Sequence, residues 1–226
     1  GGGGNQICGF ADIQKAKFGQ VNNLVVPASK FGNQSDVFTG IDVTVNARFR
    51  KGVFAGGMST GHEVTDRCFV VDSPQELYQC HIDPPWYSTT QFKFLGVYPL
   101  PWHFQVSGNV QILPSVPFLA SYVATSAQIK SSLGRDLSAG ATSTVALDLI
   151  PNNTEFREGW NTQVDFRLSR NFQIGERWKF EPTMDLFNAL NASSVLSANS
   201  RYGSAWQNAL IVLGGRVIKF GVQVNF

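Results

Sequence analysis

The last twelve residues of the chain, Gly215 to Phe226, have the strictest pattern in the sequence. Side chains of an extended strand point alternately to its two faces, and apolar residues occupy every second position from 218 onward. The apolar positions are Ile218, Phe220, Val222, Val224 and Phe226, and the positions between them are Lys219, Gly221, Gln223 and Asn225. This pattern predicts a β-strand with one apolar face and one largely polar face.

The same alternation recurs earlier, so the sequence predicts an all-β chain. Further strands are predicted over 36–50, 53–65, 89–98, 103–112, 161–172 and 177–190. Short turns are predicted at Lys51-Gly52, 99–102 and 173–176, whereas the connections 67–88, 113–160 and 191–207 are long. Short and long connections alternate, as in an antiparallel up-and-down meander with every long loop at one end, which is the layout of outer-membrane barrels.

Two parts of this meander are irregular. Residues 1–35 have no sustained period and are interpreted as a long loop region with short local structure. The strand over 53–65 contains Gly56, Gly57 and Gly61, which predict a bend or a bulge.

The segment 114–159 allows two interpretations. The stretches 119–125 and 143–150 are strand-like, and 131–140 is loop-like. The segment is therefore either one hairpin beyond the sheet or two full strands. Residues 36–226 are accordingly expected to form a meander of about seven to nine strands.

The composition excludes two classes of protein. The net charge is +2 and 15% of the residues are charged, which gives no electrostatic basis for binding nucleic acid. A membrane-spanning helix needs about 20 consecutive apolar residues, and the most apolar run, 209–213, is far shorter. A membrane-spanning strand needs only about 9–11 residues. The 18 Phe and 22 Gly suit a β protein with aromatic belts and many turns.

The three cysteines are Cys8, Cys68 and Cys80. Cys68 and Cys80 lie at the two ends of one proline-containing loop, so we expect them to form a disulfide in an oxidising compartment, with Cys8 left over. Three free thiols are the alternative. A metal site that adds His81 to Cys68 and Cys80 fits no standard zinc spacing.

Six stretches spread across the chain carry a resemblance to a known family. They are V-N-A-R-F at 45–49, F-K-F-L-G-V-Y-P-L-P-W at 92–102, S-L-G-R-D-L-S at 132–138, N-T-Q-V-D-F-R-L-S-R-N-F at 161–172, D-L-F-N-A-L-N at 185–191 and the terminal G-R-V-I-K-F-G-V-Q-V-N-F. With these stretches the chain resembles the C-terminal barrel portion of TonB-dependent outer-membrane receptors. It is most similar to those of acidobacterial type, which carry a carboxypeptidase-regulatory-like domain.

The resemblance implies a transporter in the outer membrane of a Gram-negative cell. Such receptors have a 22-stranded barrel around a plug and take up a scarce nutrient with energy from the TonB complex. This chain is then expected to be the C-terminal part of the barrel, open at both edges, with 1–35 as an extracellular loop region. The plug and the TonB-contacting segment are expected N-terminal to it, outside these residues. The ligand stays open among siderophore, cobalamin, oligosaccharide and peptide.

The expected partners of the chain follow from the same resemblance. They are outer-membrane lipid, the protein's own plug and remaining barrel wall, the TonB complex and the barrel-assembly machinery. That machinery is expected to recognise the terminal strand as an assembly signal, through Phe220, Val222, Val224 and Phe226.

The alternation and the turns also assign expected positions to individual residues. The residues expected to face lipid are Ile41, Val43, Val45, Phe104, Val106, Val110, Val164, Phe166 and Leu168, and those expected to face the lumen are Gln105, Ser107, Asn109, Asp165 and Arg167. Tyr98, Trp102 and Trp178 lie by short turns and are expected in an aromatic girdle at the periplasmic interface. Trp86, Tyr87, Trp160, Tyr202 and Trp206 lie by long loops, where they either form an outer girdle or contact the ligand.

The sequence gives no basis for an enzyme or a cofactor. No serine has the context of a nucleophile elbow, and Asp165 and Asp185 are expected as solvated charges beside Arg167 and Lys179. Two other functions stay open. One is a passive porin or an adhesin-like structural barrel, and the other is a soluble β-sandwich that acts as a binding module.

Overall fold

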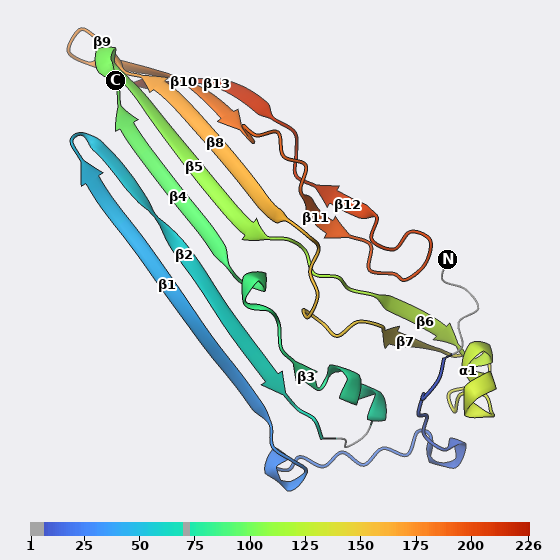
Figure 1. Cartoon of the computed structure of the whole chain (residues 1–226). Coiled ribbons are helices and arrows are strands. Elements are labelled where there is room, and N and C mark those ends of the chain that lie inside the picture. Colours follow the sequence, from blue (N-terminus) through green and yellow to red (C-terminus); the bar gives the residue numbers. More distant parts are fainter. Residues whose placement is uncertain (1–6, 70–72) are drawn as a thin grey trace.

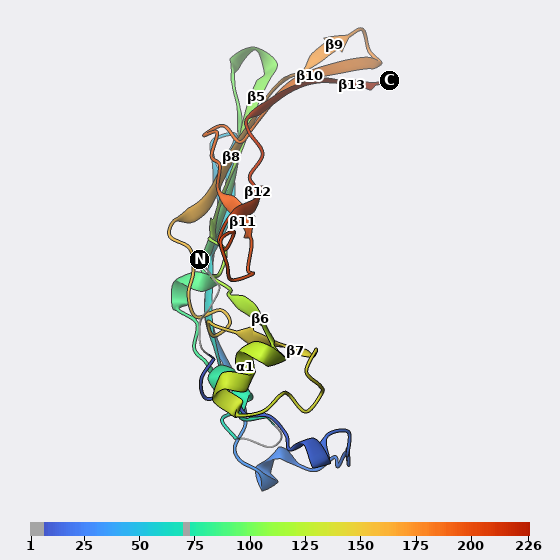
Figure 2. The ribbon, with the colours of Figure 1, turned by 90° about the vertical axis from the view of Figure 1, so that its right-hand side faces the viewer.

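The computed structural model of the chain describes residues 7–69 and 73–226. Antiparallel β-sheet dominates it, which confirms the all-β prediction. Seven long strands are neighbours in the order β1-β2-β4-β5-β8-β10-β13, and the short strands β3 and β9 extend this sheet at its ends. Figure 1 shows one continuous sheet, and Figure 2 shows it nearly edge-on as a single curved layer.

The elements have the following bounds. The main sheet contains β1 (Ser35–Phe49), β2 (Gly52–Asp66), β3 (His81–Ile82), β4 (Gln91–Pro99), β5 (Phe104–Pro114), β8 (Trp160–Arg170), β9 (Phe172–Ile174), β10 (Trp178–Phe187) and β13 (Val217–Asn225). Two separate hairpins consist of β6 (Ser121–Thr125) with β7 (Thr144–Asp148) and of β11 (Val195–Ala198) with β12 (Ala209–Val212). The helical elements are α1 (Ser126–Leu133) and the 3-10 turns η1 (Lys15–Lys17), η2 (Ala28–Lys30), η3 (Pro74–Gln79), η4 (Trp86–Ser88) and η5 (Pro101–His103).

The two ends of the sheet differ in their connections. The short turns β1–β2, β4–β5 and β9–β10 lie at one end, together with the last residue of the chain (Figure 1). The long connections, both hairpins and α1 lie at the other end. The division of short and long connections between the two ends of the sheet therefore agrees with the sequence prediction.

Two short turns are displaced from their predicted positions. Gln173 and Ile174, predicted in the last turn, pair with Lys179 and Trp178 in β9, so that turn lies at 175–177.

The first short turn is displaced by one residue. Phe49 pairs with Gly52, so the turn residues are Arg50 and Lys51, and Arg50 has the left-handed φ of 53°. Gly52 is the first residue of β2, and the Tyr98 ring lies over it: a Cβ at this position would lie 2.6 Å from that ring.

Of the bend or bulge predicted in β2, the bulge is wrong. Pairing of β2 with β1 runs from Ser35–Asp66 to Phe49–Gly52 without a register shift, and the pairing with β4 is equally regular. Gly56 permits a close approach instead, since a Cβ there would lie 2.5 Å from the Phe94 ring and from the carbonyl oxygen of Lys93.

For segment 114–159 the structure selects the hairpin. Strands β6 and β7 pair with each other outside the main sheet, and α1 follows β6 directly. The helix was not predicted, and it includes the first three residues of the expected loop at 131–140. It begins with a capping box between Thr125 and Gln128 and ends at Gly134, whose φ is 76°.

The prediction of a loop throughout 191–207 is also wrong. Residues 195–198 form β11, which pairs with the apolar run 209–212 of β12. The chain then crosses to the main sheet, where β13 begins at Val217.

The compact core of the described chain lies among the long connections and not under the sheet. Ala124, Ile129 and Leu137 are buried together, with Tyr122 and Val145 packed against them. The long strands, by contrast, leave large apolar side chains exposed, among them Val43, Phe166 and Phe220. An apolar sheet face normally packs against a second layer, and the described residues provide none for this sheet.

Candidate functional site

One face of the main sheet is apolar over all seven long strands. Residues directly opposite each other in an antiparallel pair lie on the same face, and the register connects the strands through Val43–Met58, Met58–Phe92, Phe94–Val110, Val110–Val164, Leu168–Met184 and Met184–Phe220. We call the face that contains these residues the apolar face. Every residue that the sequence analysis expects to face lipid lies on it. Its polar members are few, among them Thr39, Thr60 and Thr162.

The opposite face, called the polar face, holds the residues expected in the lumen. The register pairs Gln105 with Ser169, Ser107 with Arg167, and Asn109 with Asp165. Nε and Nη2 of Arg167 donate to the buried carboxylate of Asp185 at 2.5 and 3.1 Å. Asp165 accepts from the backbone N–H of Asn188 at 2.8 Å. Both carboxylates therefore connect neighbouring segments of the chain, and the prediction that Asp185 is a solvated charge is wrong because the paired strands bury its side chain.

Aromatic rings gather on the apolar face beside the short turns. Tyr98 stacks with Phe49 at 6.1 Å between ring centroids, and Trp178 packs against Phe180 at 6.3 Å and Phe226 at 5.5 Å. The Arg170 guanidinium lies over the rings of Phe104 and Phe172, at 4.8 and 4.3 Å from their centroids. Trp102, the third predicted girdle residue, lies in the β4–β5 turn, with a left-handed φ of 57°. Its carbonyl oxygen accepts from Nε of Arg170 at 3.2 Å.

The aromatic residues predicted at the long loops do not form one site. Trp86 stacks on His62 at 5.3 Å, Tyr87 meets Phe156 edge-on at 5.9 Å, and Trp160 meets Phe92 at 6.4 Å. Tyr202 and Trp206 pack together at 5.5 Å. Phe92 and Trp160 lie on the apolar face, the placement expected of the outer girdle.

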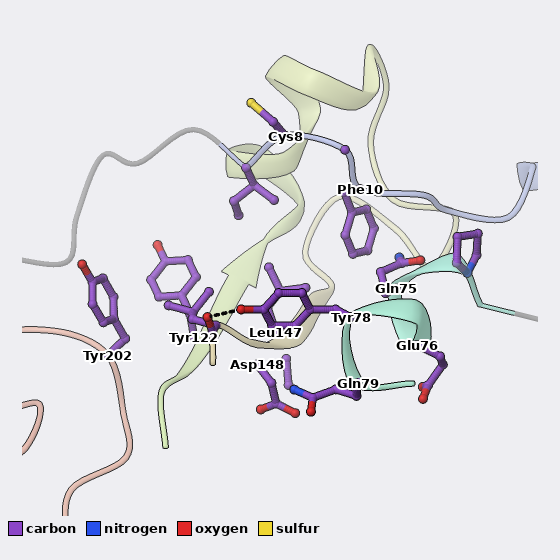
Figure 3. Close-up of a pocket in the computed structure, with 15 residues that line it drawn as sticks. Cys8, Phe10, Gln75, Glu76, Tyr78, Gln79, Tyr122, Leu147, Asp148 and Tyr202 are labelled. Carbon is purple, nitrogen blue, oxygen red and sulfur yellow. Dashed lines mark hydrogen bonds between the residues drawn. The ribbon is translucent and has the colours of Figure 1, made fainter. Parts of the chain in front are cut away.

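A cavity of about 600 Å³ lies among the long connections. Of the five candidates for ligand contact, Tyr202 alone lines it. The wall also contains Phe10, Tyr78 and Tyr122, which the sequence analysis did not select. Figure 3 shows the three tyrosine rings along one row, with Phe10 on one side of it and Asp148 on the other. We call this space the loop cavity.

The loop cavity is closed on one side by residues 7–13, here called the strap. Arg135 donates from Nη1 to the Asp12 carboxylate at 2.6 Å and from Nη2 to the carbonyl oxygen of Ile13 at 2.8 Å. The N–H and the hydroxyl of Ser138 both donate to the same carboxylate at 3.0 Å. The Gln75 side chain donates to the carbonyl oxygen of Ala11. The strap is thus bound to both the α1 region and η3.

The disulfide prediction is confirmed. Cys68 and Cys80 are joined, with their Cα atoms 4.8 Å apart. The Arg67 N–H donates to the carbonyl oxygen of Cys80 at 2.8 Å, and β3 pairs with the end of β2 at the same point. The bond closes the base of the loop that carries η3, and it excludes the metal site with His81 because both sulfur atoms are used. Cys8 is a free, exposed thiol at the edge of the loop cavity.

The electrostatics of Asp12 predict that the strap is sensitive to acid. Burial raises the pKa of the Asp12 carboxyl, but the hydrogen bonds from Ser138 and Arg135 outweigh it, so the pKa lies below its ordinary value. A lowered folded-state pKa stabilises the fold above the ordinary value of about 3.9, and this contribution is lost as the pH falls through the folded-state pKa. Exchange of the Ser138 amide, whose N–H donates to this carboxylate, is expected to be slowed at neutral pH, after correction for intrinsic rates, and to lose that protection as the pH falls below about 3.9.

The variant Asp12→Ala is expected to release the strap at neutral pH. A hydrogen bond to a charged group contributes about 1.5–3 kcal/mol, so local protection of the Ser138 amide, which donates to the Asp12 carboxylate, is expected to fall by about 2 kcal/mol. Asp136→Ala is the matched control, because Asp136 forms an exposed ion pair with Lys130 at 3.2 Å, and such pairs contribute about 0–1 kcal/mol. Equal effects of the two variants would contradict this role of Asp12.

Comparisons with protein-family models, curated proteins and solved structures gave no match to this chain. Within residues 7–69 and 73–226, no helix has the length and apolarity needed to cross a bilayer. Those residues also contain no group of three or more His, Cys, Asp or Glu side chains placed to hold a metal ion.

Proposed function

We propose that this chain forms the C-terminal part of the β-barrel of a TonB-dependent receptor in the cell outer membrane, which takes up a scarce nutrient with energy from the TonB complex. The observation that carries the proposal is the apolar face: seven paired strands expose it, and no described element covers it. A contiguous apolar surface of this extent marks a contact with a membrane or a partner. Lipid is the partner that also accounts for the aromatic rings near the two ends of the strands.

The distribution of rings and loops supports the same assignment. Outer-membrane barrels have short turns on the periplasmic side, longer loops outside, and an apolar band bounded by aromatic residues. Tyr98 and Trp178 lie at the short-turn end of the apolar face, and Phe92 with Trp160 lies toward the long-loop end. The disulfide suits the long loops, since disulfides persist in oxidising compartments outside the cytoplasm.

The sheet edges support a wall that is continued by other strands. Among the described strands β1 pairs with β2 alone and β13 with β10 alone. An unpaired backbone group costs several kcal/mol in lipid, so both edges need partners in a membrane. The proposed partners are the remaining strands of a 22-stranded barrel, and the polar face then surrounds a plug. TonB coupling, the plug and the assembly machinery enter this proposal through the sequence resemblance.

The proposal is tested in a strain that lacks the full-length protein. A growth or uptake screen identifies a nutrient whose accumulation depends on the protein. We expect that accumulation to stop when TonB is deleted or when a protonophore collapses the proton gradient. Accumulation that depends on the protein but not on energy identifies a passive porin. Recovery of the detergent-free native protein in the soluble fraction would overturn the membrane assignment and favour the soluble binding module.

Phe226 is expected to matter more for assembly than for stability. Its ring packs on Trp178 and is 91% exposed, so Phe226→Ala removes little contact area from the wall. We expect lower outer-membrane levels of the full-length variant, with unchanged heat-modifiability of the fraction that is inserted. Trp178→Ala is the matched control, because it removes the other ring of this pair without changing the terminal strand. Normal surface levels of Phe226→Ala would show that the assembly-signal role is wrong.

A further inference from the structure

The described wall of the loop cavity combines aromatic rings with acidic side chains and has no basic side chain. Four aromatic rings line it: Phe10 from the strap, Tyr78 from η3, Tyr122 from β6, and Tyr202 from the connection between β11 and β12. Its charged side chains in the described residues are Glu76 and Asp148, and no Lys, Arg or His is among them. The volume of about 600 Å³ falls within the range of about 300–1,000 Å³ typical of small-molecule sites.

Several neutral polar groups of the wall form hydrogen bonds within the protein. The Tyr78 hydroxyl donates to the carbonyl oxygen of Leu149 at 2.8 Å. Gln79 donates to the carbonyl oxygen of Ile150 at 3.3 Å and accepts from the Asn152 N–H at 2.9 Å. The Tyr122 hydroxyl accepts from Nε2 of Gln128 at 2.6 Å, outside the wall itself. These hydrogen bonds hold the rings of Tyr78 and Tyr122 in the wall, whereas the Oε1 atom of Gln75 has no hydrogen-bond partner among the described residues.

The two carboxylates are different. Neither Glu76 nor Asp148 has a hydrogen-bond or ion-pair partner among the described side chains, and both are exposed. Figure 3 shows Asp148 and Glu76 on the side of the tyrosine row away from Phe10. Unpaired carboxylates and aromatic ring faces together recognise organic cations: the carboxylates form ion pairs, and the rings attract the cation by cation–π interaction.

We propose that the loop cavity binds a small organic cation, a ligand with an ammonium or guanidinium group on an apolar or aromatic body. Anionic ligands are disfavoured because the described wall has no basic side chain to pair with them. The binding site is inferred from the cavity wall alone. That its ligand is the transported nutrient rests on the proposed function.

The test is a binding measurement on the purified full-length protein in detergent, with three probes of similar shape. The probes are benzyltrimethylammonium, the neutral N-benzylacetamide and the anionic benzylsulfonate, each titrated by calorimetry and by saturation-transfer NMR. We expect benzyltrimethylammonium to bind at least about tenfold more tightly than either analogue. Tighter or equal binding of either analogue, or no binding of benzyltrimethylammonium, would overturn the proposal.

Two variants locate the bound cation. Tyr78→Leu and Asp148→Asn are each expected to weaken benzyltrimethylammonium binding by roughly 3- to 30-fold, the range of a cation–π or charge contact. The matched controls are Tyr87→Leu and Glu155→Gln, which change an exposed ring and an exposed carboxylate outside the cavity wall. Equal losses in the variants and the controls would show that the cation binds elsewhere.

This experiment separates the two proposals. Binding is measured without TonB, so cation binding with energy-independent uptake would leave the site standing and reject the transporter. Energy-dependent uptake of a nutrient by a protein that shows no selectivity among the three probes would support the transporter and reject the cation site.

Discussion

Val222→Arg is expected to lower the free energy of unfolding of the full-length protein in a bilayer by about 2–4 kcal/mol, the cost of an arginine near the midplane of a barrel wall. Val222 lies in the middle of β13, opposite Pro182 on the apolar face, and 66% of its surface is exposed in this chain. Nothing in the described residues covers it, so only the surroundings of the apolar face determine the effect. The measurement is urea unfolding in lipid vesicles, followed by tryptophan fluorescence and by heat-modifiability.

The neighbouring residue provides the control. Gln223 lies opposite Glu181 on the polar face, where an arginine is solvated and can pair with that carboxylate. Gln223→Arg is therefore expected to change stability by less than about 1 kcal/mol. If the two substitutions have the same effect, the two faces of β13 do not contact lipid and water respectively, and the prediction that β13 belongs to a membrane wall is wrong.

Removal of the disulfide is expected to have the second largest effect on stability. This effect is expected at the end of the sheet that carries the long connections. Cys68 and Cys80 are separated by 12 positions, and a disulfide that closes such a loop contributes about 3 kcal/mol in the chain-entropy model. The double variant Cys68→Ser, Cys80→Ser is expected to lose that amount locally, because the loop carries η3 and with it one wall of the loop cavity.

Limited proteolysis and hydrogen exchange measure this local effect. Cleavage between residues 67 and 79 is expected to increase sharply in the double variant, whereas exchange in β4, β5 and β8 stays unchanged. Cys8→Ser is the control, since the Cys8 thiol is free and exposed. Unchanged proteolysis in the double variant, or general destabilisation of the long strands, would contradict a local role.

The sequence predicts the sheet well because strand alternation is a local property. Each residue of β5, for example, follows its neighbour to the opposite face, so Phe104 and Val106 are separated from Gln105 and Ser107 before any partner strand is known. The register then preserves this separation across the sheet, since a slip by one residue would place polar side chains on the apolar face. The glycines of β2 led to the wrong prediction of a bulge, because Gly56 accommodates the Phe94 ring instead.

The elements beyond the sheet were harder to predict. Helix α1 is eight residues long and rich in serine, with little amphipathic pattern, and its only clear signals are the capping box at Thr125 and the glycine at its end. The loop cavity could not be predicted, because Phe10, Tyr78, Tyr122 and Tyr202 come from four segments that are distant in sequence. The positions of Trp86 and Trp160 by long loops predict either an outer girdle or ligand contact, and the structure packs the two rings on His62 and Phe92.

The central claim is that the apolar face contacts lipid and the polar face lines an interior, and nitroxide scanning of β5 tests it most directly. Single labels are placed in the full-length protein in vesicles at Gln105, Val106, Ser107, Asn109, Val110 and Gln111. We expect accessibility to oxygen to dominate at Val106 and Val110, and accessibility to a water-soluble nickel chelate to dominate at the other four positions. Mixed accessibility within either set, or water accessibility at all six positions, would contradict a membrane wall.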